Sequence, residues 1–314
     1  MLLPILSLLA GFILLMWSAD AFTDNGAKIA RIFNISPLVI GLLIFGFGTS
    51  APEMLVSGLA AYDGHPEMSI GNAFGSNILN IGLVLGVTAI ILPITVEKSV
   101  LKKEWLFLFL STLIVGFLLL DGFLSFTDGL ILISLLTLFL INVFRESKKN
   151  NLTDSDNDSL ENNSQKNDKG RTWLLLIVSL IILVSSARLV VWGGTSLALS
   201  FGVSDLIIGL TVVALGTSLP ELAVSISSAL KKQHQMVIGN IIGSNLFNTL
   251  GVLAIPGLIL PFQIPTEVMG RDFFFMLMFT LLVLILSMRL KISRFGGFIL
   301  LTALTIYLYQ LFWI

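Results

Sequence analysis

The sequence predicts an all-α polytopic membrane protein of ten transmembrane helices, arranged as two inverted-topology five-helix repeats. First, the 314-residue chain is 55% hydrophobic and only 12% charged, whereas ordinary soluble domains carry about 25% charged residues. Second, polar breaks leave ten apolar segments of the length that spans a bilayer, roughly 20 residues. Third, the two halves repeat one another with five segments each, and an odd number of spans places the copies in opposite orientations.

The ten segments follow from the positions of polar, proline and glycine residues along the chain. The first could pass for a signal peptide, but it lacks the basic region that such a peptide needs, so we expect a retained helix. The segments cover approximately residues 3–32, 36–60, 68–92, 101–120, 126–144, 172–200, 204–230, 236–260, 267–288 and 293–313.

A polar stretch at residues 145–171 separates the first repeat, 1–144, from the second, 172–314. Its Asn, Ser, Asp and Lys content cannot bury apolar area, which predicts a flexible linker. Lys and Arg gather in this linker and in the connections that share its side, whereas the opposite connections hold mainly Asp and Glu. The positive-inside rule therefore predicts a cytoplasmic linker in the cell membrane, with both termini outside.

Composition also excludes several classes of function. The chain has no cysteine, so disulfides and thiolate metal sites are excluded. It has only two histidines and a net charge of −1, which disfavours a histidine metal site and gives no reason to expect nucleic acid as a partner. The expected surroundings are the lipid bilayer, and we expect a monomer without a cofactor.

The repeat is strongest over residues 36–85 and 204–253. A shift of 168 residues aligns 33–85 with 201–253 without a gap, and 24 of these 53 positions are identical. The match includes "GTSAPE" at 48–53 with "GTSLPE" at 216–221, and "GNAFGSNILN" at 71–80 with "GNIIGSNLFN" at 239–248. Chance matches between apolar helices would not reproduce these polar blocks.

The first block places Glu53 and Glu221 near the centres of apolar segments, where an ionised carboxylate normally faces a cavity or a partner. Pro52 and Pro220 remove helical hydrogen bonds, which predicts freed carbonyl groups one turn earlier. Carboxylate, hydroxyl and carbonyl oxygens from two inverted copies form the hard-oxygen donor set that Ca²⁺ takes, and such a set also suits Na⁺.

The second block lines one helical face with polar side chains. Ser76 and Asn80, and likewise Ser244 and Asn248, stand four residues apart, so we expect them in the site. For Asn72 and Asn240, a role in holding helices together is equally compatible with the pattern. Arg188, whose repeat equivalent is Asp20, could pair with that residue across the bundle or could snorkel to the interface.

These paired blocks resemble the α-repeats of the sodium/calcium exchanger family, within the calcium:cation antiporter superfamily, in a compact form similar to its prokaryotic members. The resemblance implies that Glu53 and Glu221 are central Ca²⁺ ligands. Some members of that family have Asp where this chain has Asn248. The asparagine lacks the negative charge that the Asp could supply, which argues against potassium dependence. The implied set also includes carbonyls of Thr49 and Thr217, and Na⁺ ligands from Ser50, Ser218, Ser76, Ser244, Gly46 and Ala214, with Asn80 and Asn248 lining the middle position.

The sequence therefore predicts a secondary antiporter that exchanges Ca²⁺ for Na⁺ by alternating access, and not an enzyme. The first and sixth segments are the long ones that the resemblance implies slide as a pair. A Ca²⁺/H⁺ antiporter of the same superfamily is the nearest alternative, and the hydroxyls of Ser50 and Ser218 favour Na⁺. A cation channel is the alternative from a different class, although channel filters are normally rings from several copies.

Overall fold

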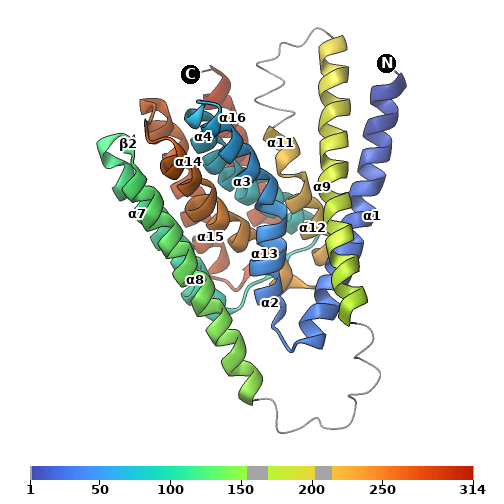
Figure 1. The fold of residues 1–314 in the computed structure, drawn as a ribbon. Coiled ribbons are helices and arrows are strands. Elements are labelled where there is room, and N and C mark those ends of the chain that lie inside the picture. The colour runs from blue at the N-terminus through green and yellow to red at the C-terminus, as the bar shows by residue number, and fades with distance from the viewer. Residues whose placement is uncertain (1, 154–168, 202–213, 314) are drawn as a thin grey trace, which may run out of the picture.

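The computed structural model describes residues 2–153, 169–201 and 214–313 (Figure 1). Within them, nine helices are long and apolar enough to cross a membrane, and Leu219–Leu230 is a shorter apolar helix. This shorter helix lies in the expected segment 204–230, of which residues 204–213 are outside the described part. The all-α membrane architecture is confirmed.

The first repeat descends and ascends through the bundle in five passes. Some passes contain short π-helical stretches, so that one membrane pass carries several labels. In chain order its elements are α1 (Leu2–Ile32), α2 (Pro37–Ile40), η1 (Gly41–Phe45), α3 (Gly46–Tyr62), α4 (Pro66–Leu79), η2 (Asn80–Leu85), α5 (Gly86–Ile91), β1 (Ile94–Thr95), α6 (Lys98–Lys102), α7 (Glu104–Leu118), η3 (Leu119–Asp121), β2 (Phe123–Leu124) and α8 (Phe126–Thr153).

The second repeat follows the same pattern in the opposite direction. Its π-helical stretch η5 corresponds to η2 of the first repeat, and α14 corresponds to α5. The elements are α9 (Lys169–Ser200), α11 (Ala214–Thr217), α12 (Leu219–Leu230), α13 (His234–Leu246), η5 (Phe247–Val252), α14 (Ala254–Ile259), β3 (Phe262–Gln263), η6 (Val268–Phe273), α15 (Phe274–Ser287), β4 (Lys291–Ile292) and α16 (Arg294–Trp313).

Two short strand pairs join the repeats and display their symmetry. β1 pairs with β4, with Ile94 opposite Ile292. β2 pairs with β3, with Leu124 opposite Phe262. Because 94 corresponds to 262 and 124 to 292 under the 168-residue shift, each pair is the repeat image of the other. The start of α1 and the end of α16 lie at one end of the bundle, here called the terminal side (Figure 1).

The opposite end, here called the linker side, holds the end of α8 and the start of α9 (Figure 1). α8 continues to Thr153 and α9 begins at Lys169. Helix therefore occupies both ends of the stretch assigned to the linker from sequence, while residues 154–168 lie outside the described part of the chain.

α1 and α9 pack along one another at one edge of the bundle (Figure 1). Small residues permit this approach: a Cβ on Gly11 would lie 2.7 Å from Val190 Cγ2, and one on Gly193 would lie 2.8 Å from the Pro4 carbonyl oxygen. Close approach through glycine is the usual packing device between membrane helices, since lipid offers no hydrophobic driving force for association. The other helices enclose the larger apolar core, around α4, α7, α13 and α15.

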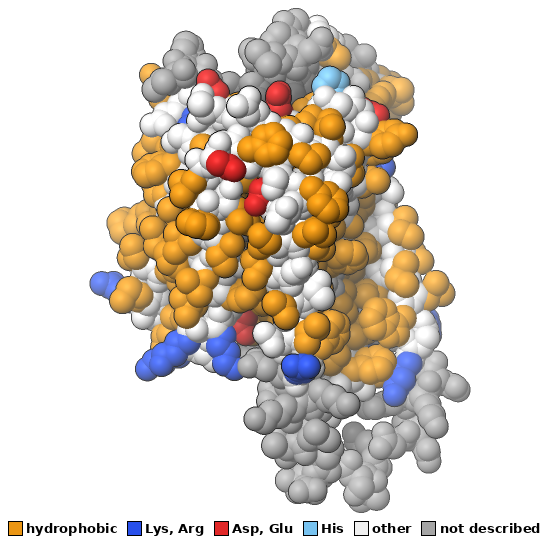
Figure 2. Space-filling model, turned by 60° about the vertical axis from the view of Figure 1, so that its left-hand side comes forward, with side chains coloured by type: hydrophobic (Ala, Val, Ile, Leu, Met, Phe, Trp, Pro, Cys, Tyr) orange, Lys and Arg blue, Asp and Glu red, His pale blue; other side chains and the backbone are white. Residues whose placement is uncertain are grey.

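The outer surface is apolar over the middle of the bundle. Figure 2 shows orange side chains across this height, while most Lys and Arg side chains on the visible face lie toward the linker side. Exposed large side chains such as Phe117, Ile181 and Ile285 belong to this apolar surface. Such a surface fits hydrocarbon as the solvent.

Candidate functional site

The two glutamates of the repeated blocks lie buried where the repeats meet. Glu53 on α3 and Glu221 on α12 are each 1% exposed. Ser50, one turn before Glu53, donates its hydroxyl to Glu221 Oε1 at 3.4 Å. A side chain of the first block therefore reaches the carboxylate of the second, and the two copies form one site.

The helices around the two prolines differ. α3 runs unbroken from Gly46 to Tyr62 with Pro52 inside it. In the second repeat the helix is interrupted: α11 ends at Thr217, Ser218 has non-helical geometry, and Pro220 stands in the first turn of α12. The helix is therefore interrupted near the second proline only, whereas the first helix keeps helical geometry around Pro52, which still has no N–H to donate to the carbonyl four residues earlier.

Close backbone contact between the repeats aligns further hydroxyls. A Cβ on Gly46 would lie 2.8 Å from backbone atoms of Gly243, so neither residue leaves room for a side chain there. The next turn brings Thr49 Oγ1 to 3.3 Å from Ser244 Oγ. These glycines serve to bring the hydroxyl of one repeat within hydrogen-bonding distance of the other.

Several buried polar atoms of the blocks have no hydrogen-bond partner among the described residues. Burying such an atom unpaired costs about 1–3 kcal/mol, and more where the group is charged. Those on residues that the sequence places in the site are mostly oxygens. They are both carboxylate oxygens of Glu53, Oε2 of Glu221, the hydroxyl of Ser218, and the amide atoms of Asn80 and Asn248.

Asn80 and Asn248 share one backbone feature. Asn80 begins η2 and Asn248 lies in η5, and both stretches are π-helical. π-helical turns are rare and frequent at functional sites. Both side chains are buried, at 1% and 0% exposure.

Matched hydrogen bonds from two asparagines hold the glutamate backbones. Asn72 Nδ2 donates to the Glu53 carbonyl at 3.1 Å and to Ser57 Oγ at 2.9 Å. The second copy repeats both bonds: Asn240 Nδ2 donates to the carbonyl of Glu221 at 3.3 Å and to the hydroxyl of Ser225 at 3.0 Å. The sequence singled out the two asparagines but not the serines, whose repeated spacing four residues after each glutamate was the available signal.

The remaining expected residues take less uniform positions. Ser76 is buried and donates to Asn72 Oδ1 at 3.4 Å. Thr217 is half-buried at the end of α11, and Ala214 begins that short helix. Within the described residues, no group of three or more His, Cys, Asp or Glu side chains could hold a metal. The blocks therefore supply two carboxylates and additional neutral oxygens as possible cation ligands.

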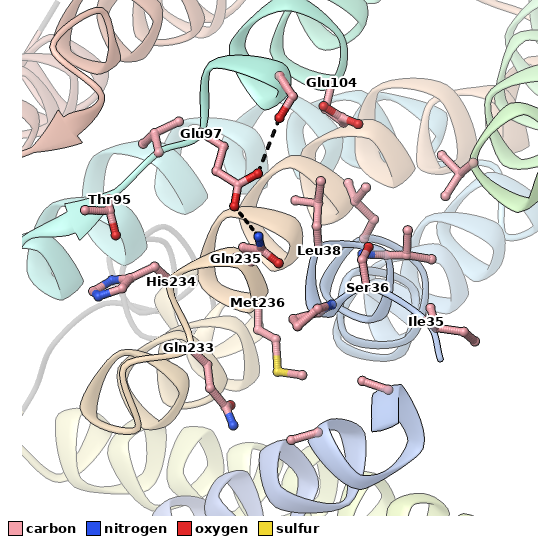
Figure 3. A pocket seen from close by; sticks show the side chains of 18 of the residues that line it. Ile35, Ser36, Leu38, Thr95, Glu97, Glu104, Gln233, His234, Gln235 and Met236 are labelled. Atoms are coloured by element: carbon pink, nitrogen blue, oxygen red, sulfur yellow. Dashed lines mark hydrogen bonds between the residues drawn. The ribbon is translucent and has the colours of Figure 1, made fainter. Parts of the chain in front are cut away.

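Described residues line two cavities, at different distances from the blocks. One of about 390 Å³, between α9 and the helices α3, α11 and α12, is lined by Pro52, Thr217, Pro220 and Arg188, among others. A larger one of about 1240 Å³ opens on the linker side and is lined by none of the expected site residues. Figure 3 shows part of its wall, where Glu97 accepts a hydrogen bond from Gln235. The smaller cavity is the one that adjoins the blocks.

Comparison with known proteins identifies the family. The model of the family described as sodium/calcium exchanger protein matches residues 3–145 and 171–313, which is nearly the whole chain. The chain belongs to the sodium/calcium exchanger family. The two matched ranges coincide with the two repeats.

Relatives cover the chain from end to end. A putative antiporter, CaxA of Alkalimonas amylolytica, is 41% identical over 99% of each chain. The sodium/calcium exchanger MaX1 of Methanosarcina acetivorans is 29% identical over 98% of each. A solved structure of the sodium-calcium exchanger NCX_Mj superposes with a TM-score of 0.84 at 38% identity, covering 99% of each chain. The protein is thus a multi-span membrane transporter that exchanges cations, including Ca²⁺, and not an enzyme.

Proposed function

We propose that this exchanger transports Ca²⁺ in exchange for Na⁺, with the cations bound between the repeats. The carrying observation is that carboxylate oxygens of both glutamates are buried without a hydrogen-bond partner, as are the hydroxyl of Ser218 and the amide groups of Asn80 and Asn248, all on residues at 0–1% exposure. Within the described residues, no lysine or arginine forms an ion pair with either glutamate. A bound cation would supply the missing counter-charge.

The proposed Ca²⁺ position is central. Glu53 and Glu221 provide its charged oxygens, and the carbonyls of Thr49 and Thr217 complete it, since Ca²⁺ takes six to eight oxygens at 2.3–2.6 Å. Two carboxylates balance one Ca²⁺ or two Na⁺, so the same charge can be neutralised by either ion. Mutual exclusion at one pair of carboxylates is the physical basis of the exchange.

The proposed Na⁺ positions flank the centre and use groups without formal charge. They would be formed by the hydroxyls of Ser50, Ser218, Ser76 and Ser244 and the carbonyls of Gly46 and Ala214, with Asn80 and Asn248 lining the middle. The pairing of Thr49 with Ser244 and of Ser50 with Glu221 supports this arrangement, because it gathers the hydroxyls of both repeats at one place. These neutral oxygens favour Na⁺ over H⁺ as the counter-ion.

Transport would follow by alternating access. Inverted repeats differ in conformation, and exchanging those conformations moves the opening from one side to the other. With both carboxylates unpaired, a closed low-dielectric site would oppose the return of the unloaded carrier, which couples the two fluxes. The linker is proposed to be cytoplasmic and both termini external, following the distribution of Lys and Arg. The transporter is proposed to act as a monomer in the cell membrane.

The test is ⁴⁵Ca²⁺ uptake by proteoliposomes under an imposed Na⁺ gradient or, separately, an imposed pH gradient. Uptake driven by an outward Na⁺ gradient is expected, with no response to pH. Uptake driven by pH without Na⁺ would refute Na⁺ coupling in favour of Ca²⁺/H⁺ exchange. Flux without any counter-ion gradient would refute exchange and indicate a channel.

A further inference from the structure

Two asparagines outside the proposed ligand set share one geometry. Asn72 on α4 and Asn240 on α13 occupy equivalent positions in the repeats. Each donates both amide hydrogens to the neighbouring helix that carries the glutamate, here called the glutamate helix. One hydrogen goes to the glutamate carbonyl and the other to the serine hydroxyl one turn later. A primary amide has two N–H donors, so these two hydrogen bonds use its full donor capacity.

We infer that Asn72 and Asn240 are positioning residues that hold Glu53 and Glu221 in register for the cation. This inference rests on the proposed function. Two bonds one turn apart prevent the glutamate helix from rotating or sliding relative to its partner helix. Side-chain oxygens that must meet one ion need such support, since a displacement near 1 Å is costly at a binding site.

The nearby Asn77 offers a matched control. It is also buried on α4 and donates across helices, to Thr249 Oγ1 at 2.8 Å and to Met276 Sδ at 3.2 Å, but it does not bond a glutamate helix. Asn72→Leu, Asn240→Leu and Asn77→Leu each remove an amide that donates hydrogen bonds to another helix. Only the first two release a glutamate backbone.

The readouts are the melting temperature with and without Ca²⁺, and the Ca²⁺ concentration for half-maximal uptake. Asn72→Leu and Asn240→Leu are expected to raise that concentration about tenfold and to shrink the Ca²⁺-induced rise in melting temperature. Asn77→Leu should lower the melting temperature without Ca²⁺ and leave the half-maximal concentration within about twofold. If all three variants change only the ion-free melting temperature, the positioning role is refuted. If the unmodified protein shows no Ca²⁺-dependent stabilisation, the proposed function fails instead.

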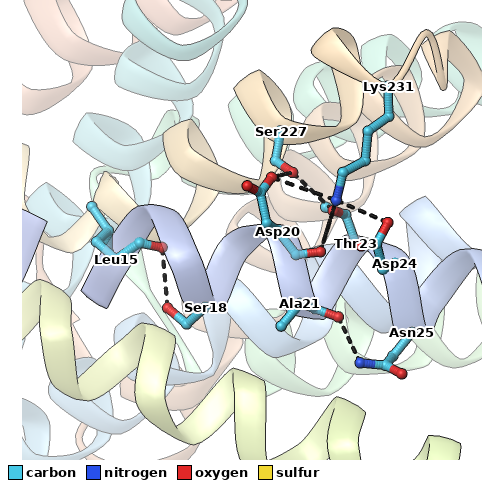
Figure 4. Close-up of polar contacts among 9 residues, drawn as sticks. All are labelled: Leu15, Ser18, Asp20, Ala21, Thr23, Asp24, Asn25, Ser227 and Lys231. Carbon is cyan, nitrogen blue, oxygen red and sulfur yellow. Dashed lines mark hydrogen bonds and ion pairs between the residues drawn. The ribbon is translucent and has the colours of Figure 1, made fainter. Parts of the chain in front are cut away.

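An independent observation concerns a polar network between α1 and α12 on the linker side (Figure 4). Lys231 Nζ donates to the Asp20 carbonyl at 2.8 Å and to Thr23 Oγ1 at 2.9 Å. It also pairs with Asp24 Oδ1 at 2.9 Å and with Asp20 Oδ1 at 3.4 Å. Ser227 donates to Asp20 Oδ1 at 2.5 Å and shares a 2.8 Å bond with Thr23. These five residues are here called the α1–α12 latch.

The structure therefore does not contain the Asp20–Arg188 pair that was one of the two alternatives considered from sequence. Asp20 binds Lys231 rather than Arg188, which instead is exposed and lines the cavity beside the blocks. Asp63, the C-cap residue of α3, is exposed as well. Among the described residues, neither Arg188 nor Asp63 forms an ion pair.

The repeat relates these four charges to one another. Asp20 corresponds to Arg188, and Lys231, the C-cap residue of α12, corresponds to Asp63. The acid and the base have therefore exchanged places between the copies. If the repeats exchange conformations, Arg188 and Asp63 take the relative positions that Asp20 and Lys231 have here. A like-charged arrangement would have prevented this closure.

We propose that the α1–α12 latch closes the linker side and that Arg188 with Asp63 forms its counterpart on the terminal side. Each closes while the other is open. The counterpart lacks the hydroxyls, because Thr23 and Ser227 correspond to Val191 and Leu59. The linker-side latch is thus the stronger, which biases the ion-free carrier toward closure on that side. The proposal rests on alternating access.

Thiol labelling can test the linker-side latch because the chain contains no cysteine. Ser228 is buried on α12 between Glu221 and Lys231, and cysteine is nearly isosteric with serine. Labelling of Ser228→Cys by a maleimide is expected to accelerate about tenfold when Lys231→Gln is added, equivalent to ~1.4 kcal/mol. The control is Lys232→Gln, which removes the adjacent charge but no latch bond. Equal rates in the two backgrounds would overturn the latch.

The counterpart is tested by charge reversal with the same reporter. Asp63→Lys opposes Arg188 with a like charge, so labelling of the cysteine at 228 should slow and exchange should fall. Adding Arg188→Asp restores an opposite-charge pair and should return both rates to within about twofold of the starting protein. Failure of the double variant to recover would refute the counterpart. The labelling rate can be measured without transport. If the protein proves not to couple Ca²⁺ to Na⁺, the labelling rates therefore still test the counterpart.

Discussion

Replacing Gly243 by alanine perturbs the contact that joins the two repeats at the site. A Cβ there would lie 2.4 Å from the Leu42 carbonyl oxygen and 2.9 Å from its Cα. Ordinary contacts of a Cβ begin at 3.4 Å. The atoms in the way are backbone, so no side chain can rotate aside, and α13 must move away from η1 by about 1 Å.

The size of the effect follows from that displacement. Overpacking of a tight interface costs about 1–3 kcal/mol. A change of 1 kcal/mol shifts the melting temperature by about 2–4 °C in a large domain, so a fall of about 2–12 °C is expected. The 3.3 Å contact between Thr49 and Ser244 would also open beyond hydrogen-bonding distance. Losing about 1 kcal/mol of binding free energy there should raise the Ca²⁺ concentration for half-maximal uptake about fivefold.

The assay is thermal unfolding in detergent together with Ca²⁺ uptake by proteoliposomes. Gly58→Ala is the matched control, because its Cβ would lie 3.6 Å from Ile255 Cγ2, an ordinary contact, inside helix α3. That variant should keep its melting temperature or gain slightly, since alanine favours helix over glycine by about 0.5–1 kcal/mol. If Gly243→Ala matches Gly58→Ala in both measurements, the reasoning from close backbone contact is wrong.

Three further outcomes are expected. Glu53→Gln and Glu221→Gln should each abolish Ca²⁺ uptake in proteoliposomes while leaving a folded protein, since each removes one of the two charged ligands of the proposed site; normal uptake by either would contradict the site. Ser218→Ala should raise the Na⁺ concentration needed to inhibit Ca²⁺ uptake by half, about fivefold, with little change in melting temperature. A lower melting temperature with unaltered Na⁺ inhibition would assign Ser218 a structural role. Asp272→Asn should lower the melting temperature because it breaks the 2.8 Å pair with Arg271, at a cost of about 1–3 kcal/mol, while half-maximal Ca²⁺ stays unchanged, as uptake measurements would check.

Much of the fold was predictable because membrane insertion and repetition leave direct marks on a sequence. Hydrocarbon requires long apolar helices, so segment limits such as 3–32 and 293–313 agree closely with α1 and α16. The repeated polar blocks identified the candidate residues, because a carboxylate at membrane depth needs a local reason. Their convergence followed from the inverted repeat, and the Ser50 to Glu221 hydrogen bond agrees with it.

Other features depended on atoms that only folding brings together. The sequence treats Pro52 and Pro220 alike, yet only the second interrupts its helix, since the neighbours of a helix determine whether a proline is accommodated. From sequence, Asn72 could line the site or hold helices together, and only the structure shows that its amide bonds the Glu53 carbonyl on the neighbouring helix.

The sequence by itself determined the class of protein, the inverted repeat and the identity of the residues that concentrate oxygen in the membrane. These are properties of composition and spacing, which no packing can alter. The tertiary structure decided which charges meet: Asp20 with Lys231, and not with Arg188. Ion pairing depends on distances of a few ångströms between helices far apart in the chain, and such distances are set by packing rather than by local pattern.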